Sequence, residues 1–293
     1  VLVSEKSIEI LTGNLKILEK SLQDAQKIYE NGFNEEEDVE QLKITFGTLK
    51  NQLNNVERMK TIAYQMLNLA LGSSMDTALI LTDDLDSLVE QNINLGIISE
   101  SFEVSKHIDF QIAENDRAAK RLLMKLEQSK ALPSLSAFVN YGGQAFSDSF
   151  SFLKGSQQWF DSSLLGVSLK LPIFSSLGRQ SRINQARIAL ETSDFRLEET
   201  KQRLSLLAEK AKSDYQLSVD NYLTAKRNVG LAERIEKKQR IKFFEGISSS
   251  FDLLQAQNQL YTQQQNYVQS MLDVIAQKAA LENALNLPIK TKN

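Results

Sequence analysis

The sequence predicts a mainly α-helical protein with a small β part, in which long antiparallel helical hairpins are joined to one β-hairpin. Three observations support this prediction. A stretch of about 65 residues before the tip at Phe243 contains no proline and repeats apolar residues at helical spacing. The turn and helix after that stretch have a second copy near the start of the chain. Residues 134–174, in contrast, alternate apolar and polar side chains with the period of a strand.

Residues 1–72 are predicted to form the first helical hairpin. Apolar side chains recur at helical spacing over residues 1–31, at Ile8, Leu11, Leu15, Leu18, Leu22, Ala25 and Ile28. Gly32 ends this helix, because glycine adopts the left-handed conformation beyond a helix end at the lowest cost. A second helix then begins at Asn34 or Glu35, with acidic residues in a first turn that the helix dipole favours, and stops at Gly72.

A connection and a third helix follow the first hairpin. Residues 73–98 form the connection, in which the apolar run from Ala78 to Thr82 predicts one short strand. Residues 99–132 are predicted to be helical as far as Pro133. His107, the only histidine, falls on this helix without a partner pattern, which argues against a role as a ligand.

Residues 133–174 are predicted to be a β-hairpin that crosses a membrane. Its two strands alternate, with apolar Leu135, Ala137, Val139, Tyr141, Leu165, Val167, Leu169, Leu171 and Ile173 separated by mostly polar or small residues. Strands of about 9–11 residues are long enough to cross a bilayer in a tilted barrel. Tyr141, Trp159 and Phe160 lie near strand ends, where aromatic residues sit at the boundary between water and lipid. Gly142 to Gln158 form the loop between the strands.

Two strands alone cannot cross a membrane, because every backbone polar group in lipid needs a partner and only a closed barrel provides one. The barrel must therefore be completed by a duplicate hairpin, by other subunits, or by both. The internal repeat predicts the duplicate upstream of Val1. We therefore expect the chain to lack roughly its first hundred residues, including a strand pair and any secretion signal.

Residues 175–287 are predicted to form the second, longer helical hairpin. A first helix, roughly 95 Å long at ~1.5 Å per residue, leads to a tip over residues 243–254. A second helix runs from Leu253 to Asn286, and residues 288–293 form a tail that begins at Pro288. Aligning Gly32 with Gly246, an offset of 214 residues, superposes the two tips and the two following helices without a gap. Asp38, Gln41, Thr48, Leu67, Ala70 and Leu71 then match Asp252, Gln255, Thr262, Leu281, Ala284 and Leu285.

Composition argues against several functions. The net charge is −3, so the chain has no basic field for nucleic acid. No run of 18 apolar residues is present, and this excludes a membrane-spanning helix. Cysteine is absent, and the sequence contains no metal-ligand spacing, nucleophile constellation or phosphate loop. We therefore expect neither an enzyme nor a bound cofactor.

The order of these elements resembles that of TolC-type outer-membrane efflux channels. The matching motifs are Ala-Leu-Pro-Ser-Leu at 131–135, Gly-Val-Ser-Leu-Lys-Leu-Pro-Ile-Phe at 166–174, Phe-Phe-Glu-Gly-Ile at 243–247, Phe-Asp-Leu-Leu-Gln-Ala-Gln at 251–257, and Ala-Leu-Asn at 284–286. The family usually has Ala-Leu-Gly in the last place, as the first repeat does at 70–72. Each motif is weak alone, but their order is specific.

The resemblance implies a homotrimer in the outer membrane. Each protomer would give its strands to one transmembrane β-barrel and its helices to an α-barrel, a tunnel in the periplasm. Substrates would leave through this tunnel, with a periplasmic adaptor protein and an inner-membrane transporter as partners and outer-membrane lipid around the barrel.

The resemblance also implies particular site residues. Of two inward carboxylates expected at the gate, one matches Asp252, while the second position holds Gln255. Ser248 replaces a basic residue that usually pins the closed gate, Phe243 keeps an aromatic ring without a hydroxyl, and Asp38 takes the place of Asp252 in the first repeat. Adaptor docking would carry over to Gly32, Phe33, Gly246 and Ile247.

Alternatives stay open at two levels. Asp252 could line the pore as a threefold ring, or simply cap its helix in a box with Ser249, and the two roles are compatible. The acidic run after Gly32 could form an acidic entrance or only a solvated helix start. For the whole chain, the alternatives are a periplasmic adaptor, which also carries helical hairpins, and a coiled-coil scaffold. Neither accounts for a single alternating strand pair between the helices.

Overall fold

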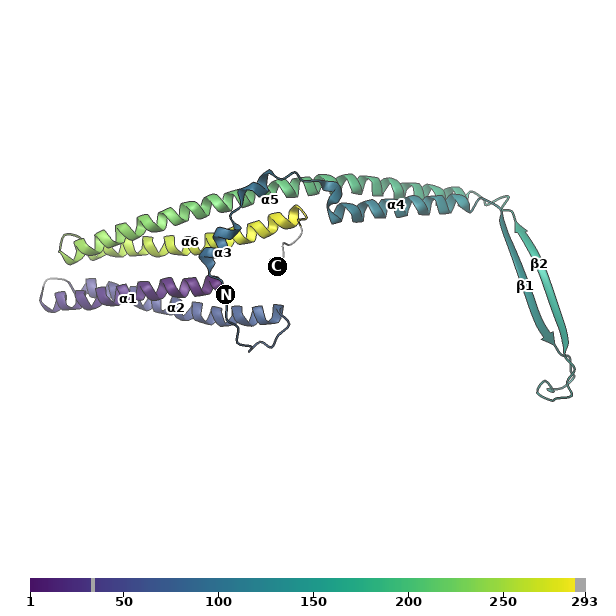
Figure 1. Ribbon diagram of the computed structural model, residues 1–293, viewed down its shortest axis with the longest axis horizontal. Helices are drawn as coiled ribbons and strands as arrows, with labels where there is room; N and C mark the ends of the chain where they lie inside the picture. Colours follow the sequence, from purple (N-terminus) through teal and green to yellow (C-terminus); the bar gives the residue numbers. More distant parts are fainter. Residues whose placement is uncertain (33–34, 288–293) are drawn as a thin grey trace. The chain divides into compact units, whose positions relative to one another are not determined.

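The structure is a computed structural model that describes residues 1–32 and 35–287. Its helices are α1 (Leu2–Glu30), α2 (Glu36–Ala70), α3 (Leu85–Asn92), α4 (Ile108–Ser129), α5 (Gly178–Phe244) and α6 (Ser250–Ala284), with short 3-10 helices η1 (Leu95–Ser99) and η2 (Val104–Lys106) after α3. Strands β1 (Ser134–Gln144) and β2 (Phe160–Lys170) form one antiparallel sheet (Figure 1). The predicted fold class, mainly α with one β-hairpin, is confirmed.

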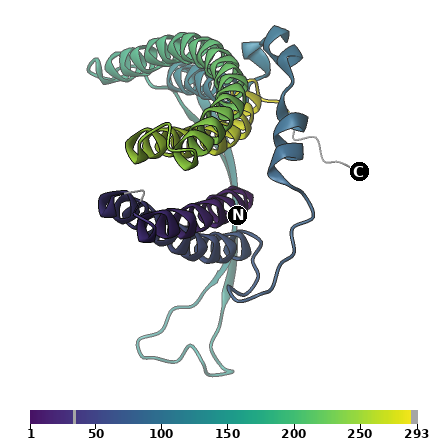
Figure 2. The same ribbon diagram turned by 90° about the vertical axis from the view of Figure 1, so that its left-hand side faces the viewer.

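The chain divides into two compact units. Unit 1 comprises Val1–Phe102 together with the chain from Ser205 onward, and unit 2 comprises Glu103–Leu204. Helix α5 therefore contributes to both. Within unit 1, α1 and α2 lie side by side as the first hairpin, and α5 and α6 meet at a second tip (Figures 1 and 2).

The repeat predicted from the sequence is present in the backbone. Helices α2 and α6 have the same length, and both of their boundaries are related by the 214-residue offset. Their C-terminal ends also agree, since Ser73 N donates to Asn68 O and Leu287 N donates to Glu282 O, each at 2.9 Å. Gly72 (φ 71°) and Asn286 (φ 53°) provide the left-handed residue that this helix ending requires. Asparagine therefore replaces glycine without changing the cap.

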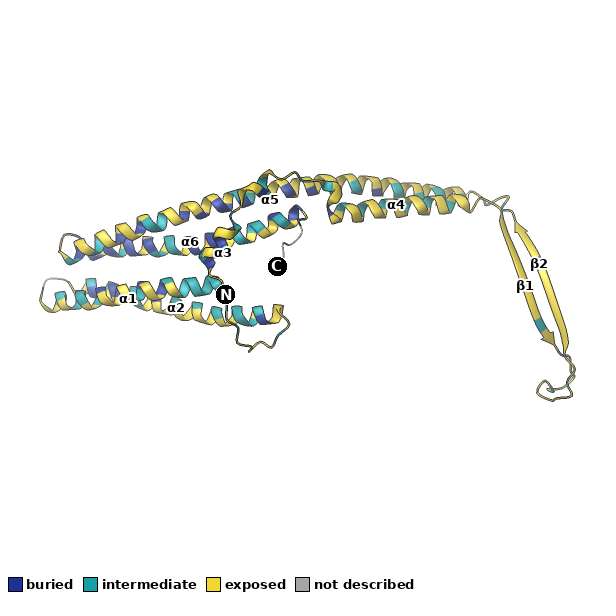
Figure 3. Ribbon diagram, in the orientation of Figure 1, coloured by how far each residue is buried: buried dark blue, intermediate teal, exposed yellow. Residues whose placement is uncertain are grey.

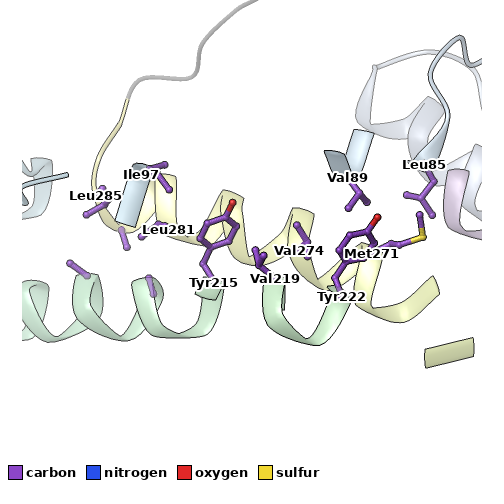
Figure 4. Packing of buried hydrophobic residues seen from close by; sticks show 13 residues of the cluster. Leu85, Val89, Ile97, Tyr215, Val219, Tyr222, Met271, Val274, Leu281 and Leu285 are labelled. Carbon is purple, nitrogen blue, oxygen red and sulfur yellow. The ribbon is translucent and has the colours of Figure 1, made fainter. Parts of the chain in front are cut away.

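The core of unit 1 is closed by a segment that we call the strap, residues 85–99, which contains α3 and η1. Apolar side chains of the strap pack against α5 and α6: Leu85, Val89 and Ile97 lie against Tyr215, Val219, Tyr222, Met271, Val274, Leu281 and Leu285 (Figure 4). Tyr215 is fully buried, and its hydroxyl donates to Asn92 O at 2.7 Å and accepts from Asn94 N at 2.9 Å. One side chain thus satisfies two backbone groups at the turn of the strap.

Asp86 ties the strap to both hairpins of unit 1. Its carboxylate lies 3.0 Å from Lys6 Nζ of α1 and accepts a 3.1 Å hydrogen bond from the Tyr267 hydroxyl of α6. The hydrogen bond to Asp86, aided by Glu9, raises the pKa of Lys6 despite partial burial. Burial raises the pKa of Tyr267, whose ring stacks on Tyr222 with centroids 5.7 Å apart, so this hydroxyl stays a donor.

Two predictions for the connection and for the helix after it are wrong. Residues 78–82 do not form a strand: they have no described strand beside them to pair with, and Ile80 is 91% exposed. The third helix begins at Ile108 rather than Ser99. Phe102 instead packs against the unit 1 core, and Lys212 Nζ donates to Glu100 O at 3.2 Å, which supports an extended backbone. His107 lies before this helix rather than within it, and its Nδ1 accepts from Asp109 N as the N-cap.

Unit 2 contains α4, the first part of α5 and the β-hairpin. Helix α4 has no buried residue (Figure 3). Its exposed side chains include the apolar residues Ile112, Leu122, Leu123 and Leu126. Arg117 of α4 pairs with Asp194 of α5, and Glu127 pairs with Arg182 at 3.6 Å. Polar contacts therefore join these helices, while apolar surface remains open.

The strands are displaced from their predicted ends. Strand β1 continues through Gly142–Gln144, which the sequence assigns to the loop, because these residues pair with Ser162–Phe160. Strand β2 stops at Lys170, before Leu171 and Ile173, since Pro172 has no N–H to donate to the ladder.

Candidate functional site

The two hairpin tips share one turn geometry. Gly32 and Gly246 have φ values of 77° and 70°, the left-handed region that glycine occupies without strain. Gly32 N donates to Tyr29 O at 2.8 Å, and Gly246 N donates to Phe243 O at 3.1 Å, again 214 residues apart. Both glycines and Ile247 are exposed, whereas Phe33 lies outside the described residues.

Asp252 forms the predicted capping box at the start of α6. Its N–H donates to Ser249 Oγ at 3.2 Å, while its Oδ2 accepts from Ser249 N at 3.3 Å and from Ser249 Oγ at 2.9 Å. The box uses one carboxylate oxygen and leaves the side chain exposed. Capping therefore fixes the direction of Asp252 without removing its charge from solvent.

The first repeat lacks this device. Glu35 is the N-cap of α2 and makes no side-chain cap, and Asp38 N donates to the backbone Glu35 O at 3.3 Å. Asp38 is half-buried at the position equivalent to Asp252. The two carboxylates thus occupy matching places with different restraint.

Phe243 lies in an apolar cluster that joins the two tips. It is 4% exposed and packs with Leu18, Ala25, Val39, Leu42 and Leu253, and its ring meets Phe244 edge-to-face at 5.2 Å. Helices α1, α2, α5 and α6 all contribute to this cluster. The missing hydroxyl is consistent with this setting, because a buried phenol would need a hydrogen-bond partner.

The other gate candidates lie around this cluster. Gln255 is exposed, and Ser248 is half-buried with an Oγ that has no hydrogen-bond partner among residues 1–32 and 35–287. Sequence reasoning missed a polar link between the tips, in which Ser250 Oγ donates to Gln41 Oε1 at 3.5 Å. Its signal was available, since Gln41 and Gln255 are identical under the repeat.

The β-hairpin has one apolar face and one polar face. Cross-strand partners on the first face are Leu135 with Leu169, Ala137 with Val167, Val139 with Leu165, and Tyr141 with Ser163, followed at the loop end by Gly143 with Asp161. The opposite face carries Ser134, Ser136, Phe138, Asn140, Gly142, Gln144, Phe160, Ser162, Leu164, Gly166, Ser168 and Lys170. Val139 is 76% exposed and Leu165 is 74% exposed, so no described part of the chain covers the apolar face (Figure 3).

The three aromatic residues predicted to lie at a membrane boundary are exposed at one end of this sheet. Tyr141 belongs to β1, Phe160 begins β2, and the Trp159 ring lies against Gly143, where a Cβ would approach its Cε3 to 3.4 Å. The structure therefore gathers all three near the loop end of the hairpin. Phe138 covers Gly166 across the strands, and a Cβ there would clash with its ring.

The described residues show neither a membrane-spanning helix nor a cluster of metal ligands. Of the helices in residues 1–32 and 35–287, none combines the length and apolar character needed to span a membrane. Within that part of the chain, no three His, Cys, Asp or Glu side chains are grouped to hold a metal ion.

Duplicated helical hairpins with matched tips, together with an exposed β-hairpin that is apolar on one face, define a class of mainly helical proteins with a small β part. The chain belongs to the outer membrane efflux protein family, whose model matches residues 104–287, well over half of the sequence. The predicted resemblance to TolC-type channels is thereby confirmed.

Solved structures share this fold at low sequence identity. CusC, described in terms of transmembrane channel formation, has a TM-score of 0.81 and 18% identity, covering 97% of this chain and 65% of its own. The outer membrane protein VceC from Vibrio cholerae has a TM-score of 0.77 and 17% identity over 97% of this chain and 66% of its own. The outer-membrane channel OprN has a TM-score of 0.75 and 15% identity over 97% and 63%.

The chain matches only part of the length of these solved structures. The chain spans slightly less than two thirds of the length of VceC, CusC and OprN. No curated protein sequence matches it.

Proposed function

We propose that this chain is a subunit of a trimeric outer-membrane channel, a passive duct through which small molecules or peptides leave the cell. It is a transport channel rather than an enzyme. The observation that supports this function is the uncovered apolar face of the β-hairpin, opposite a face rich in serine. Lipid outside and water inside a barrel require this arrangement.

Association of copies follows from the incomplete sheet. A two-stranded sheet leaves unpaired backbone groups on both edges, which lipid cannot satisfy. Copies of the chain supply the missing neighbours. The unburied apolar residues of α4 support the same conclusion, because contiguous exposed apolar surface marks an interface.

The helical hairpins then form the periplasmic tunnel, with the tips as its gate. Asp252 points a charged group into solvent from a fixed cap, so three copies place a ring of carboxylates at one level of the pore. Asp38 and Gln255 flank this ring, and Ser248 supplies no basic latch. Phe243 acts beneath them by holding the tips together.

A periplasmic adaptor protein and an inner-membrane transporter are the proposed partners. The exposed turn residues Gly32, Gly246 and Ile247, together with Phe33, form the docking positions at the tips. Their exposure and repeated backbone geometry give the adaptor two similar binding points on each protomer.

The test is single-channel recording of the full-length protein in planar lipid bilayers. A trivalent cation should block the wild-type channel from the tip side, and Asp252→Ala should weaken that block several-fold while conduction persists. Asp220→Ala, which removes an exposed carboxylate of α5 more than twenty residues before the tip, is the control and should leave the block unchanged. Absence of any conductance would contradict the duct, whereas conductance with unchanged block would only remove Asp252 from the pore.

A further inference from the structure

A polar group is buried between α5 and α6 close to the second tip. Glu236 of α5 is 5% exposed and Gln257 of α6 is 1% exposed. Glu236 precedes Gly246 by ten residues and Gln257 follows it by eleven, so the hairpin brings them to the same level. Apolar neighbours in sequence share their buried faces: Ala232 and Phe243 on α5, and Leu253 and Leu260 on α6.

The polar atoms of this group are unsatisfied. In the described part of the chain, Glu236 Oε1 and both amide atoms of Gln257 lack a hydrogen-bond partner. Arg240 Nε lies 3.7 Å from Glu236 Oε1, which is an ion-pair distance but too long for a hydrogen bond. Folded proteins rarely leave buried polar atoms without partners, because each one costs desolvation energy. Glu236 and Gln257 therefore require a hydrogen bond that their unprotonated side chains do not form in this arrangement.

We propose that Glu236 and Gln257 form a proton-binding site that controls the packing of α5 on α6 near the tip. A proton taken from solvent by the Glu236 carboxylate converts one oxygen into a donor, and this O–H donates to Gln257 Oε1. One proton thereby satisfies two buried acceptors. After the proton leaves, Gln257 must turn its amide so that Nε2 faces the carboxylate, and the Glu236 charge stays buried beside Arg240.

Burial, rather than the surrounding charges, favours the protonated state of Glu236 within the packed hairpin. Burial raises the pKa of Glu236, although Arg240 and Gln257 both act in the opposite direction. On α6, Tyr261 faces the site as a neutral hydroxyl, since burial and then the Glu236 charge raise its pKa. On the α1 side, Lys16, Lys20 and Asp24 border the groove that Arg240 and Glu245 also line.

The direction of the pH effect follows from this raised pKa. Packing is stabilised while Glu236 is protonated, and this contribution is lost as the pH rises through the pKa of the folded state. The segment beside the tip is therefore tight in acid and loose at alkaline pH. The inference concerns packing within one chain and holds whether or not the protein conducts.

Distance measurements between spin labels test this switch. The chain contains no cysteine, so Lys238→Cys on α5 and Gln259→Cys on α6, both at exposed positions, give one labelled pair in the full-length protein. We expect a narrow interhelix distance distribution at pH 5 that broadens at pH 8. Glu236→Gln, a neutral replacement of the same shape, should stay narrow at both values. Glu233→Gln, which removes an exposed carboxylate one turn earlier, is the matched control and should broaden like the wild type.

A second variant tests the proton itself. Arg240→Gln removes the cation that lowers the pKa of Glu236. The pH midpoint of broadening should therefore move up, toward alkaline pH. An upward shift supports the proton site. Broadening that persists in Glu236→Gln, a wild-type distribution that does not respond to pH, or a midpoint that fails to rise in Arg240→Gln would each overturn it.

Discussion

Replacing Tyr215 by phenylalanine should selectively loosen the strap. The ring of Tyr215 stays in the core, but the hydroxyl that bonds Asn92 O at 2.7 Å and Asn94 N at 2.9 Å is removed. Asn92 is half-buried, so its carbonyl loses a partner that water replaces poorly. Asn94 is exposed, and its N–H recovers a hydrogen bond to water.

The expected cost follows from this difference. A hydrogen bond contributes about 0.5–1.5 kcal/mol net, and an unsatisfied buried group costs about 1–3 kcal/mol. Because water rehydrates one of the two backbone groups, we expect Tyr215→Phe to lower the free energy of opening the strap by about 1.5 kcal/mol. At ~1.4 kcal/mol per factor of ten, this corresponds to roughly tenfold faster hydrogen exchange.

Hydrogen exchange measured on peptides covering residues 85–99 of the full-length protein checks this value. Tyr64→Phe is the control, since it removes a 3.0 Å hydrogen bond to Glu5 that does not involve the strap. It should leave exchange of residues 85–99 unchanged. If Tyr215→Phe also leaves that exchange unchanged, the hydroxyl does not hold the strap and the reasoning from its two bonds is refuted.

Three further predictions concern the tip and the β-hairpin. Gly246→Ala should destabilise the second tip by about 1–2 kcal/mol, because a φ of 70° strains an L-residue. Gly230→Ala is the control: this residue lies inside α5 with open space around it, so the change should stabilise the protein by about 0.5–1 kcal/mol. Thermal unfolding of the two variants measures both effects. Val167→Lys on the apolar face should cost about 2–4 kcal/mol in the bilayer and abolish assembly in membrane fractions, whereas Ser168→Lys on the opposite face should assemble. The single tryptophan, Trp159, should be quenched more by lipids brominated near the headgroup than by lipids brominated deep in the chain; equal or reversed quenching would contradict its boundary position.

Local patterns predicted the elements that depend on neighbouring residues. The capping box of Ser249 and Asp252 spans three residues, and the two tip glycines are needed by their own backbone angles. The strand alternation around Val139 and Val167 likewise depends only on the pleat. These predictions agree with the structure because the interactions that decide them lie within one turn or one strand.

Residues whose role depends on distant partners were harder to predict. Glu236 was not singled out, although it occupies the apolar stripe of α5 between Ala232 and Phe243. Gln257 likewise interrupts the stripe formed by Leu253 and Leu260. A polar residue at an apolar stripe position was the available signal, but its burial is decided by the helix that packs against it.

The sequence by itself determined the helical hairpins, their 214-residue repeat, the turns at Gly32 and Gly246, and the two-faced β-hairpin. Each is set by backbone preference or by the period of apolar side chains. Only the tertiary structure decided that residues 78–82 form no strand, that the third helix begins at Ile108, and that Phe243 packs between the two tips. Those outcomes depend on contacts between segments far apart in the chain, such as Phe102 against the unit 1 core, and no local pattern encodes which distant surface a side chain will meet.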